Sequence, residues 1–398
     1  MTTLSAKVFD PYDYAFHEDP YPTYEWLREQ APVYRNEALG FWALSRHEDV
    51  LMAFREADLF SSADGVSLDP AATGPQAERV MSFLAMDDPK HFRMRSLVTK
   101  GFTPRRVAAL ENRVREITHE HLDAAVADGA LDFIDDLACK VPMDVVSELL
   151  GVPESERAEL RRLADVVVHR EDGVLDVPPA ASAASMDLIV YYLSLIEDRR
   201  KHRRDDLTSA LIDVDVDGER LTDEELCAFL FLMVVAGNET TTKLLGNMWW
   251  WADRFPEQKH RVLNGELSVL NWVDETLRFD ASSQVIARTC REDTELHGIT
   301  IPKGDRVLLL IGSANRDGRV FKDADRYDLA RDTTDMLSFG TGRHFCLGAN
   351  LARLEAKVVM EELLGLVGDW KVDTTGVERV HSVNVRGFAH LPSTLVHR

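Results

Sequence analysis

The sequence contains few cysteines and no long apolar run. Four cysteines occur among 398 residues, and their spacing is too wide for a zinc ribbon or a redox pair. A chain of this length with so few cysteines is not a disulfide scaffold. The longest apolar run, 228–236, is about half of the ~20 residues that span a bilayer, and residues 1–10 lack the basic-then-apolar pattern of a signal peptide. We therefore expect a cytoplasmic protein without a membrane anchor.

Basic side chains are also in short supply. The chain has 46 Lys and Arg against 68 Asp and Glu, which gives a formal net charge of −22. A surface of this average charge repels nucleic acid and anionic membranes, so neither is expected as a partner. Hydrophobic residues still make up 45% of the chain, which is enough for a large core and excludes global disorder. A basic cluster on such a surface would therefore be conspicuous.

Hydrophobic periodicity predicts a mainly α protein with a smaller β region. Apolar residues recur at helical spacing through about 89–280. The strands are expected from about 30–45 and 285–312, together with the C-terminal region. No Gly/Ser linker divides the chain. We expect one domain over residues 1–398 with a short N-terminal tail of about 15 residues.

Two segments within this domain are predicted to be loops. Residues 61–76 are dominated by Gly, Ser, Asp, Ala and Pro, and residues 170–184 contain Asp-Gly and Pro-Pro pairs. Long loops inside a compact protein often form lids or binding loops.

One central segment combines a strong helix signal with residues that disfavour a helix. Thr222 and Glu225 form a capping box, and helical character persists to about Arg254. In the middle, 236–242 reads Ala-Gly-Asn-Glu-Thr-Thr-Thr, with poor helix formers and a carboxylate inside an apolar run. The pattern leaves two interpretations open. Either one helix ends and a second begins, or a threonine hydroxyl bonds the backbone and distorts one long helix beside a cavity.

The most specific segment is 339–348, which reads Phe-Gly-Thr-Gly-Arg-His-Phe-Cys-Leu-Gly. Its glycines let the backbone turn tightly and approach a partner closely. Cys346 comes just before a predicted helix, 349–366, whose N-terminal N–H groups can stabilise a thiolate. A thiolate held by one loop, with no second cysteine nearby, suits a single axial metal bond better than a zinc site.

This segment resembles the haem-binding loop of cytochromes P450, Phe-x-x-Gly-x-His/Arg-x-Cys-x-Gly. Phe339, Gly342, His344, Cys346 and Gly348 all match. The resemblance is to the soluble bacterial type, and it implies the cytochrome P450 fold, a single haem-enclosing domain. It also implies haem b, with Cys346 as the axial thiolate ligand of the iron and with Phe339, His344 and Gly348 as cofactor-binding residues.

Two further motifs extend the resemblance. Glu275 and Arg278 match the family's Glu-x-x-Arg pair, whose spacing places both charges on one face of a helix. Arg326 is implied as the third member of this structural group, although the family's proline and phenylalanine are replaced around it. The central segment matches the family's Ala-Gly-x-Asp/Glu-Thr signature, which favours the distorted single helix and makes Ala236 a cofactor contact.

The resemblance also implies how the cofactor's carboxylates are bound. His91, Arg95, Arg288 and His344 recur at the family's propionate-binding positions. Two carboxylates that enter a protein interior need such cationic or hydrogen-bonding partners.

The implied activity is that of a haem-thiolate monooxygenase, which activates dioxygen and hydroxylates a C–H bond of an apolar small molecule. Thiolate ligation favours O–O cleavage. Thr240 is implied to hydrogen-bond to dioxygen and a water, and Glu239 to relay protons. A peroxide-driven peroxygenase and a non-catalytic haem sensor are the alternatives. The first usually replaces this acid–alcohol pair, and the second would not need it.

The two electrons are expected from an external donor, because no flavin or iron–sulfur domain fits within the chain. Basic residues around the segments expected on the proximal face suggest an acidic ferredoxin, supplied by a ferredoxin reductase, whereas ordinary solvated arginines are the alternative. These residues are Arg93, Arg95, Arg105, Arg106 and Arg343.

Substrate contacts are expected from position alone. They are placed in 61–85 and 165–185 and at the individual residues Val235, Ser283, Gln284, Val285 and Phe388. The polar Ser-Ser-Gln run at 282–284 suggests a substrate with an oxygen function. Steroid, terpenoid, fatty-acid and polyketide substrates remain open.

Overall fold

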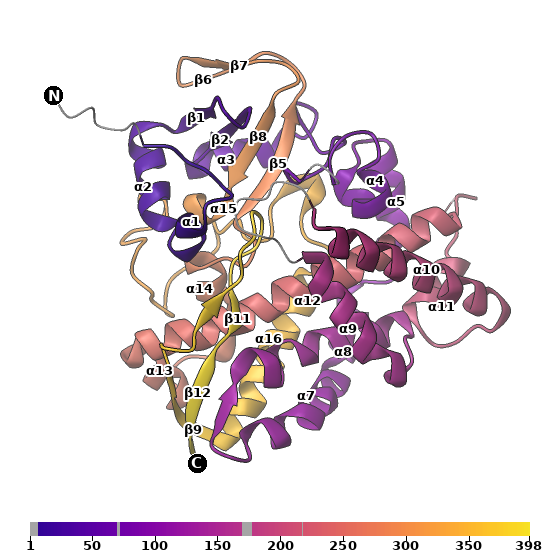
Figure 1. Ribbon diagram of the computed structural model, residues 1–398, viewed down its shortest axis with the longest axis vertical. Helices are drawn as coiled ribbons and strands as arrows, with labels where there is room; N and C mark the ends of the chain where they lie inside the picture. The colour runs from indigo at the N-terminus through magenta and orange to yellow at the C-terminus, as the bar shows by residue number, and fades with distance from the viewer. Residues whose placement is uncertain (1–6, 70–71, 169–176, 217) are drawn as a thin grey trace.

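Helices make up most of the molecule, and the main sheet lies at one edge (Figure 1). The computed structural model describes residues 7–69, 72–168, 177–216 and 218–398. The helices of its N-terminal third are α1 (Tyr14–Glu18), α2 (Tyr21–Gln30), α3 (His47–Arg55), α4 (Glu78–Met81), α5 (Lys90–Thr99), α6 (Pro104–Ala109) and α7 (Glu111–Val126). Those that follow are α8 (Lys140–Leu150), α9 (Glu154–Val168), α10 (Pro179–Lys201), α11 (Leu207–Asp213), α12 (Asp223–Arg254), α13 (Pro256–Leu263), α14 (Val269–Phe279), α15 (Ile311–Ala314) and α16 (Ala349–Leu366).

The main sheet joins the two ends of the chain. Its five strands run in the order β1 (Val33–Asn36), β2 (Phe41–Leu44), β8 (Arg306–Leu310), β5 (Val285–Cys290) and β3 (Phe60–Ser61). The pair β1–β2 is an antiparallel hairpin within the predicted strand region 30–45, with Val33 opposite Leu44. β2 and β8 are parallel, and the helical region of the chain lies between β3 and β5 of this sheet. The predicted combination of N-terminal and later strands is confirmed.

Three small sheets complete the β region. β4 (Ala130–Asp132), β12 (Pro392–His397) and β9 (Val367–Val372) form one of them, with β12 in the centre. β6 (Thr294–Leu296) pairs with β7 (Ile299–Ile301), and β10 (Glu378–Arg379) pairs with β11 (Phe388–His390). The loop between β10 and β11 reaches the main sheet through a bridge between Ser283 and Val385.

The central segment forms one unbroken helix, so the two-helix interpretation is wrong. α12 runs for 32 residues from the predicted capping box, in which Thr222 accepts from Glu225 N–H and Glu225 accepts from Thr222 N–H. It crosses the molecule and packs against α8, α10, α14 and α16 (Figure 1). Because it is covered on nearly all sides, it stays apolar around its circumference.

The start of α10 differs from the sequence prediction. The predicted loop 170–184 extended beyond Pro179, but α10 begins there with the proline in its first turn, where a missing N–H costs nothing. Residues 169–176 of that loop lie outside the described part. By length and composition, α10 meets the criterion for a membrane span, and a third of its most apolar window is buried. Its outward face carries Met186, Val190 and Leu193.

Candidate functional site

One cavity brings the central helix and the cysteine loop together. α12 contributes Ala236, Gly237, Thr240, Thr241 and Leu244 to its wall. Segments far away in the sequence supply the rest, namely Arg95 on α5, Val285 to Arg288 on β5 apart from Ala287, and Phe339, Gly340, His344, Cys346, Leu347 and Gly348 on the loop. Seven of the eight predicted cofactor-binding residues therefore line one space, and His91 lies next to it, with its ring 4.1 Å from that of His344.

The loop before α16 presents the cysteine to this cavity. Cys346 N–H donates to the Phe339 carbonyl at 2.9 Å, which closes the loop on itself. Gly342 has φ +70°, and a Cβ there would lie 3.1 Å from the Phe54 carbonyl oxygen, so both conformation and space require glycine. Burial raises the pKa of the Cys346 thiol, and the N–H groups of Gly348 and Ala349 oppose that rise by bonding to the sulfur. A metal ion bound to the sulfur deprotonates it outright.

The predicted propionate-binding residues form a positively charged group without an anion. Arg288 is 2% exposed and makes no ion pair in the described structure. Hydrogen-bond partners are absent within these ranges for Arg95 Nη1, His91 Nε2 and His344 Nδ1, although all three atoms are buried. Buried polar atoms in proteins are nearly always paired. Two carboxylates would satisfy all of them, so the residues fit the propionates of a haem.

Electrostatics within this group point the same way. Burial and the neighbouring Arg306 lower the pKa of Arg288 to about 10. Burial, followed by Arg288, lowers the pKa of His344 to about 2, and burial and Arg95 lower the pKa of His91. Both imidazoles are therefore neutral at physiological pH and can donate one N–H each to an anion. Binding of a dianionic ligand would relieve the repulsion that depresses these pKa values.

The threonines of α12 bond to their own helix. Thr240 Oγ donates to the Ala236 carbonyl at 2.7 Å, and Thr241 Oγ donates to the Gly237 carbonyl at 3.0 Å. Such bonds one turn back satisfy a hydroxyl without breaking a helix. Glu239 occupies a different face. It is 7% exposed, lies outside the cavity wall and faces Lys243, with Oε1 3.1 Å from Nζ.

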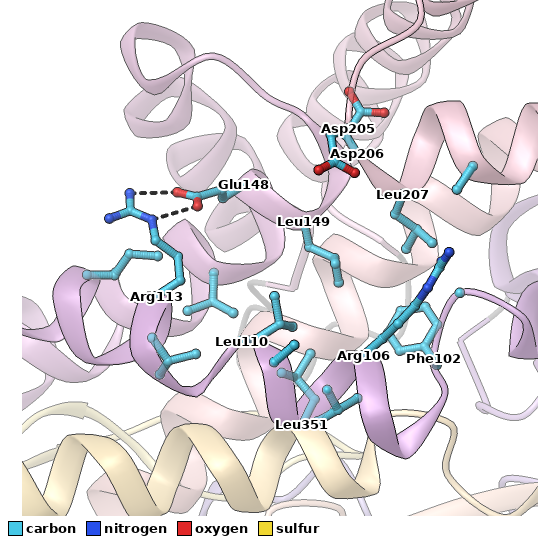
Figure 2. Close-up of a pocket in the computed structure, with 17 residues that line it drawn as sticks. Phe102, Arg106, Leu110, Arg113, Glu148, Leu149, Asp205, Asp206, Leu207 and Leu351 are labelled. Carbon is cyan, nitrogen blue, oxygen red and sulfur yellow. Dashed lines mark hydrogen bonds and ion pairs between the residues drawn. The ribbon is translucent and has the colours of Figure 1, made fainter.

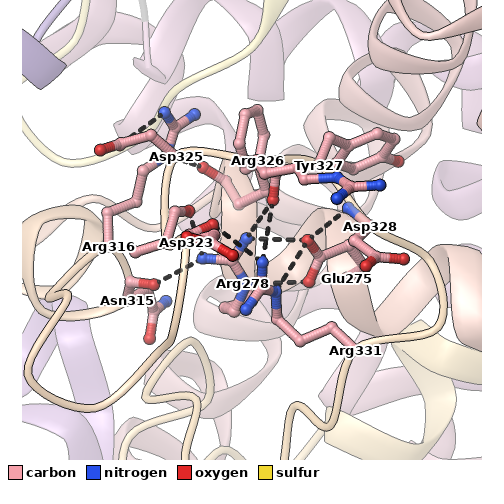
Figure 3. A network of polar contacts seen from close by, with 12 residues as sticks. Glu275, Arg278, Asn315, Arg316, Asp323, Asp325, Arg326, Tyr327, Asp328 and Arg331 are labelled. Carbon is pink, nitrogen blue, oxygen red and sulfur yellow. Dashed lines mark hydrogen bonds and ion pairs between the residues drawn. The ribbon is translucent and has the colours of Figure 1, made fainter.

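Glu275 and Arg278 form the predicted pair on α14 (Figure 3). Their two parallel contacts measure 2.8 Å and 2.7 Å, and both side chains are almost fully buried. The prediction that Arg326 completes the group is wrong, because its side chain is exposed and only its carbonyl oxygen accepts from Arg278. Arg331 is the third member instead, with Nε 3.4 Å from Glu275 Oε1.

The predicted substrate contacts divide into two sets. Ser283 and Val285 line the cavity, together with Val66, Phe83 and Leu84 from the predicted segment 61–85. Three other predicted contacts are wrong in position, namely Gln284, Phe388 and Val235. Gln284 packs on Gly312 and donates to the Ala281 carbonyl, the Phe388 ring lies against Trp250 and Arg379, and Val235 packs into the helical core. None of the described residues of 165–185 reaches this wall.

The sequence prediction missed Glu355, a buried carboxyl in the cavity wall. It lies on α16, is 1% exposed, and its Oε2 has no hydrogen-bond partner among the described residues. Burial alone raises its pKa well above the usual range, so the group is a neutral acid. The signal was present in the sequence, because Leu351, Glu355 and Val359 follow one another at four-residue spacing along an apolar stripe.

A second pocket lies between α6, α7, α8 and the start of α11, with Leu351 of α16 in its wall (Figure 2). Its floor is apolar, and the Arg113–Glu148 pair closes one side with contacts of 2.6 Å and 2.7 Å. Leu351 belongs to the walls of both pockets. This pocket contains none of the predicted site residues.

Known proteins resemble this chain in both sequence and fold. The family model for cytochrome P450 matches residues 265–367, which include the pair on α14 and the cysteine loop. A putative cytochrome P450 123 of Mycobacterium tuberculosis is 56% identical over 386 residues, 97% of this chain and 96% of that protein. The chain belongs to the cytochrome P450 family. The structure of a cytochrome P450 from Chondromyces apiculatus matches this P450 with a TM-score of 0.88 at 35% identity, over 98% of both chains.

Another relative has a named activity. A methyl-branched lipid omega-hydroxylase of Mycobacterium tuberculosis is 36% identical to this P450 over 361 residues, 89% of this chain and 84% of that protein. Family membership makes the protein a monooxygenase that carries haem with cysteine thiolate ligation. When bound, that cofactor supplies O–O bond cleavage and C–H oxidation. Of the four cysteines, Cys346 is the one in the cavity wall.

The basic cluster expected on the proximal face is smaller than predicted. Arg93 is bound to Glu219 and Glu225, and Arg343 is bound to Asp58 and Asp88. Arg95 lines the cavity and donates to the Phe345 carbonyl. The exposed cations without a carboxylate partner in the described part of this region are Lys100, Arg105 and Arg106.

Proposed function

We propose that this P450 hydroxylates a C–H bond of an apolar small molecule, with dioxygen as oxygen source and two electrons from an external donor. The observation that carries the proposal is one cavity that contains Cys346 and Thr240 within largely apolar walls. The Cys346 thiolate would bind the haem iron, and we propose that the whole chain is one cofactor-enclosing domain located in the cytoplasm. Arg95, Arg288 and the two imidazoles would bind the propionates.

Thr240 and Glu239 are proposed to deliver protons to the cavity. The Thr240 hydroxyl already donates to Ala236, so its lone pairs are free to accept a hydrogen bond from a water or to pass a proton on. The adjacent Glu239 carboxylate is the nearest acid on α12. This pair supports a monooxygenase over a peroxide-driven peroxygenase or a haem sensor, which are the alternatives in the test below.

The proposed substrate is apolar and carries an oxygen function. Leu84, Val146, Leu232, Val285 and Ile286 are among the apolar residues of the wall. The Ser282 hydroxyl faces the same cavity, is buried and has no hydrogen-bond partner in the described ranges, so a substrate hydroxyl or carbonyl can satisfy it. The named lipid hydroxylase supports a fatty-acid type substrate, and the steroid, terpenoid and polyketide types are tested beside it.

The proposed electron donor is an acidic ferredoxin, reduced by a ferredoxin reductase. Phe92 and Phe345 are 71% and 44% exposed, and Arg95 connects their region to the cysteine loop. Phe92 and Lys100 line one surface pocket, so an exposed aromatic ring lies near a free cation. Such a combination suits a small acidic protein on an otherwise acidic surface.

The direct experiment has three steps. The reduced, carbon monoxide-bound spectrum should show the long-wavelength Soret band of a thiolate ligand, and its absence would contradict the Cys346 assignment. Fatty acids, steroids, terpenoids and macrolides should then be screened for shifts of the haem spin state. Bound compounds are incubated with ferredoxin, its reductase and NADPH, and products are identified by mass spectrometry. Turnover with peroxide alone would favour the peroxygenase, and binding without any turnover would favour the sensor.

A further inference from the structure

Glu239, the acid next to Thr240 on α12, forms an ion pair with the buried Lys243 one helical turn further along. Lys243 Nζ lies 3.1 Å from Glu239 Oε1, and the two side chains are 6% and 9% exposed. The same Nζ donates to the backbone carbonyl of Phe388 at 3.1 Å. A buried charge needs a compensating partner, so the lysine compensates the Glu239 carboxylate and fixes its position.

The aliphatic part of Lys243 packs against bare backbone at Gly387. A Cβ on Gly387 would lie 2.6–2.8 Å from Cβ, Cγ and Cδ of the lysine, which is closer than real side chains approach. Gly387 and Phe388 follow Asn384, which belongs to the cavity wall. Lys243 therefore connects the Glu239 carboxylate to a segment that borders the proposed substrate space.

A second carboxyl, that of Asp165, interacts electrostatically with the pair. Asp165 lies on α9 and is exposed to solvent. Burial of its surroundings and the Glu239 carboxylate raise the pKa of Asp165 to about 6, while Lys243 and Arg161 act in the opposite direction. Thr240 is in the cavity wall, whereas Glu239 is not. The Glu239–Lys243 pair is therefore adjacent in sequence to a residue of the cavity wall, and it interacts electrostatically with a solvent-exposed carboxyl.

On the basis of the proposed monooxygenase function, we propose that Lys243 is a positioning residue that controls proton delivery by Glu239. Its ammonium group binds the carboxylate and fixes its position outside the cavity wall. A proton that reaches Glu239 from the solvent side leaves it again toward Thr240, so the carboxylate returns to its original charge.

The test removes the ammonium group of Lys243 and keeps an unbranched side chain of similar length. Lys243→Met should reduce product formed per electron pair by about tenfold, with a matching rise in peroxide. This is less than the roughly 10²–10⁴-fold that a positioned acid–base group itself contributes, because the variant keeps Glu239 and alters only its position. The solvent deuterium isotope effect on product formation should increase, because proton delivery becomes slower. Lys243→Arg should restore part of the coupling, since it retains a cation.

Lys259→Met is the matched control. Lys259 is a second buried lysine, 5% exposed, which also binds one carboxylate and one backbone carbonyl, those of Asp369 and Trp370. Its loss should destabilise the protein but leave the coupling and the isotope effect unchanged. If Lys243→Met behaves like Lys259→Met in both readouts, Lys243 has only a structural role and the inference is overturned.

A second measurement does not depend on turnover. The losses in unfolding midpoint caused by Glu239→Gln and Lys243→Met should fail to add in the double variant, because both remove one interaction. Additive losses would overturn the inference. Absence of product from the unaltered protein, with the non-additive unfolding intact, would contradict the proposed function and leave the Glu239–Lys243 link standing.

Discussion

Replacement of Glu275 by glutamine should show how much of the fold depends on the buried pair on α14. The carboxylate binds Arg278 through two contacts of 2.8 Å and 2.7 Å, accepts from Asp328 N–H at 2.9 Å and faces Arg331. Glutamine retains the shape but leaves a fully buried guanidinium without its counterion. Removal of one partner of a buried pair costs about 3–5 kcal/mol. Proteins of this kind have about 5–15 kcal/mol of stability in total, so the loss would be a large share of it.

The adjacent residue provides a control for this prediction. Asp274 binds Arg353 at 2.7 Å, but these side chains are 31% and 27% exposed, and exposed pairs contribute about 0–1 kcal/mol. Asp274→Asn and Glu275→Gln make the same chemical change one residue apart. Urea unfolding followed by far-UV circular dichroism gives both free energies, with cofactor content measured alongside. If Glu275→Gln costs no more than Asp274→Asn, the reasoning from burial is refuted.

Three other substitutions test separate parts of the site. Glu355→Gln should stabilise the protein at pH 7–8, by about 1.4 kcal/mol for each pH unit above the unfolded pKa of the carboxyl, up to its folded pKa. The free energy of unfolding of the wild-type protein should fall as the pH rises above the unfolded pKa of this carboxyl, about 4.5. The stability difference between the variant and the wild type should therefore vanish near that pH. A difference that does not depend on pH would contradict the prediction. Thr240→Ala should increase peroxide per turnover, and unchanged coupling would count against its proton role. Gly342→Ala should reduce cofactor incorporation, because the new Cβ meets the Phe54 carbonyl at 3.1 Å, and full incorporation would show that the loop can shift.

Helices whose ends carry a clear sequence signal, such as a capping box or a glycine, were predictable from the sequence. The bounds of α16 follow from the glycine before it and the end of its apolar periodicity, and the capping box fixes the start of α12. The start of α10 was missed because proline in a first turn and proline in a loop look alike in sequence. A threonine run does not end a helix when the hydroxyls bond back to carbonyls, as Thr240 and Thr241 do.

The positions of individual side chains were less predictable than the segments that contain them. Ser283 and Val285 reach the cavity but Gln284 does not, because successive residues of extended chain point to opposite sides. The prediction for Val235 is wrong for a similar reason, because consecutive side chains on a helix differ in direction by about 100°. Arg326 was chosen by its place in a motif, whereas the folded loop brings a different arginine to Glu275.

The wall of the cofactor cavity contains buried polar groups that the described chain itself does not compensate. Arg288 carries a buried charge with no ion pair in the described chain, and the two imidazoles beside it are held neutral. Desolvation of these groups costs free energy, and no carboxylate of the described residues compensates this cost. A dianionic ligand would return it, and any ligand that binds only the folded state adds its binding free energy to stability. The same cations that select the cofactor therefore make the fold depend on it, although the chain as a whole carries a net charge of −22.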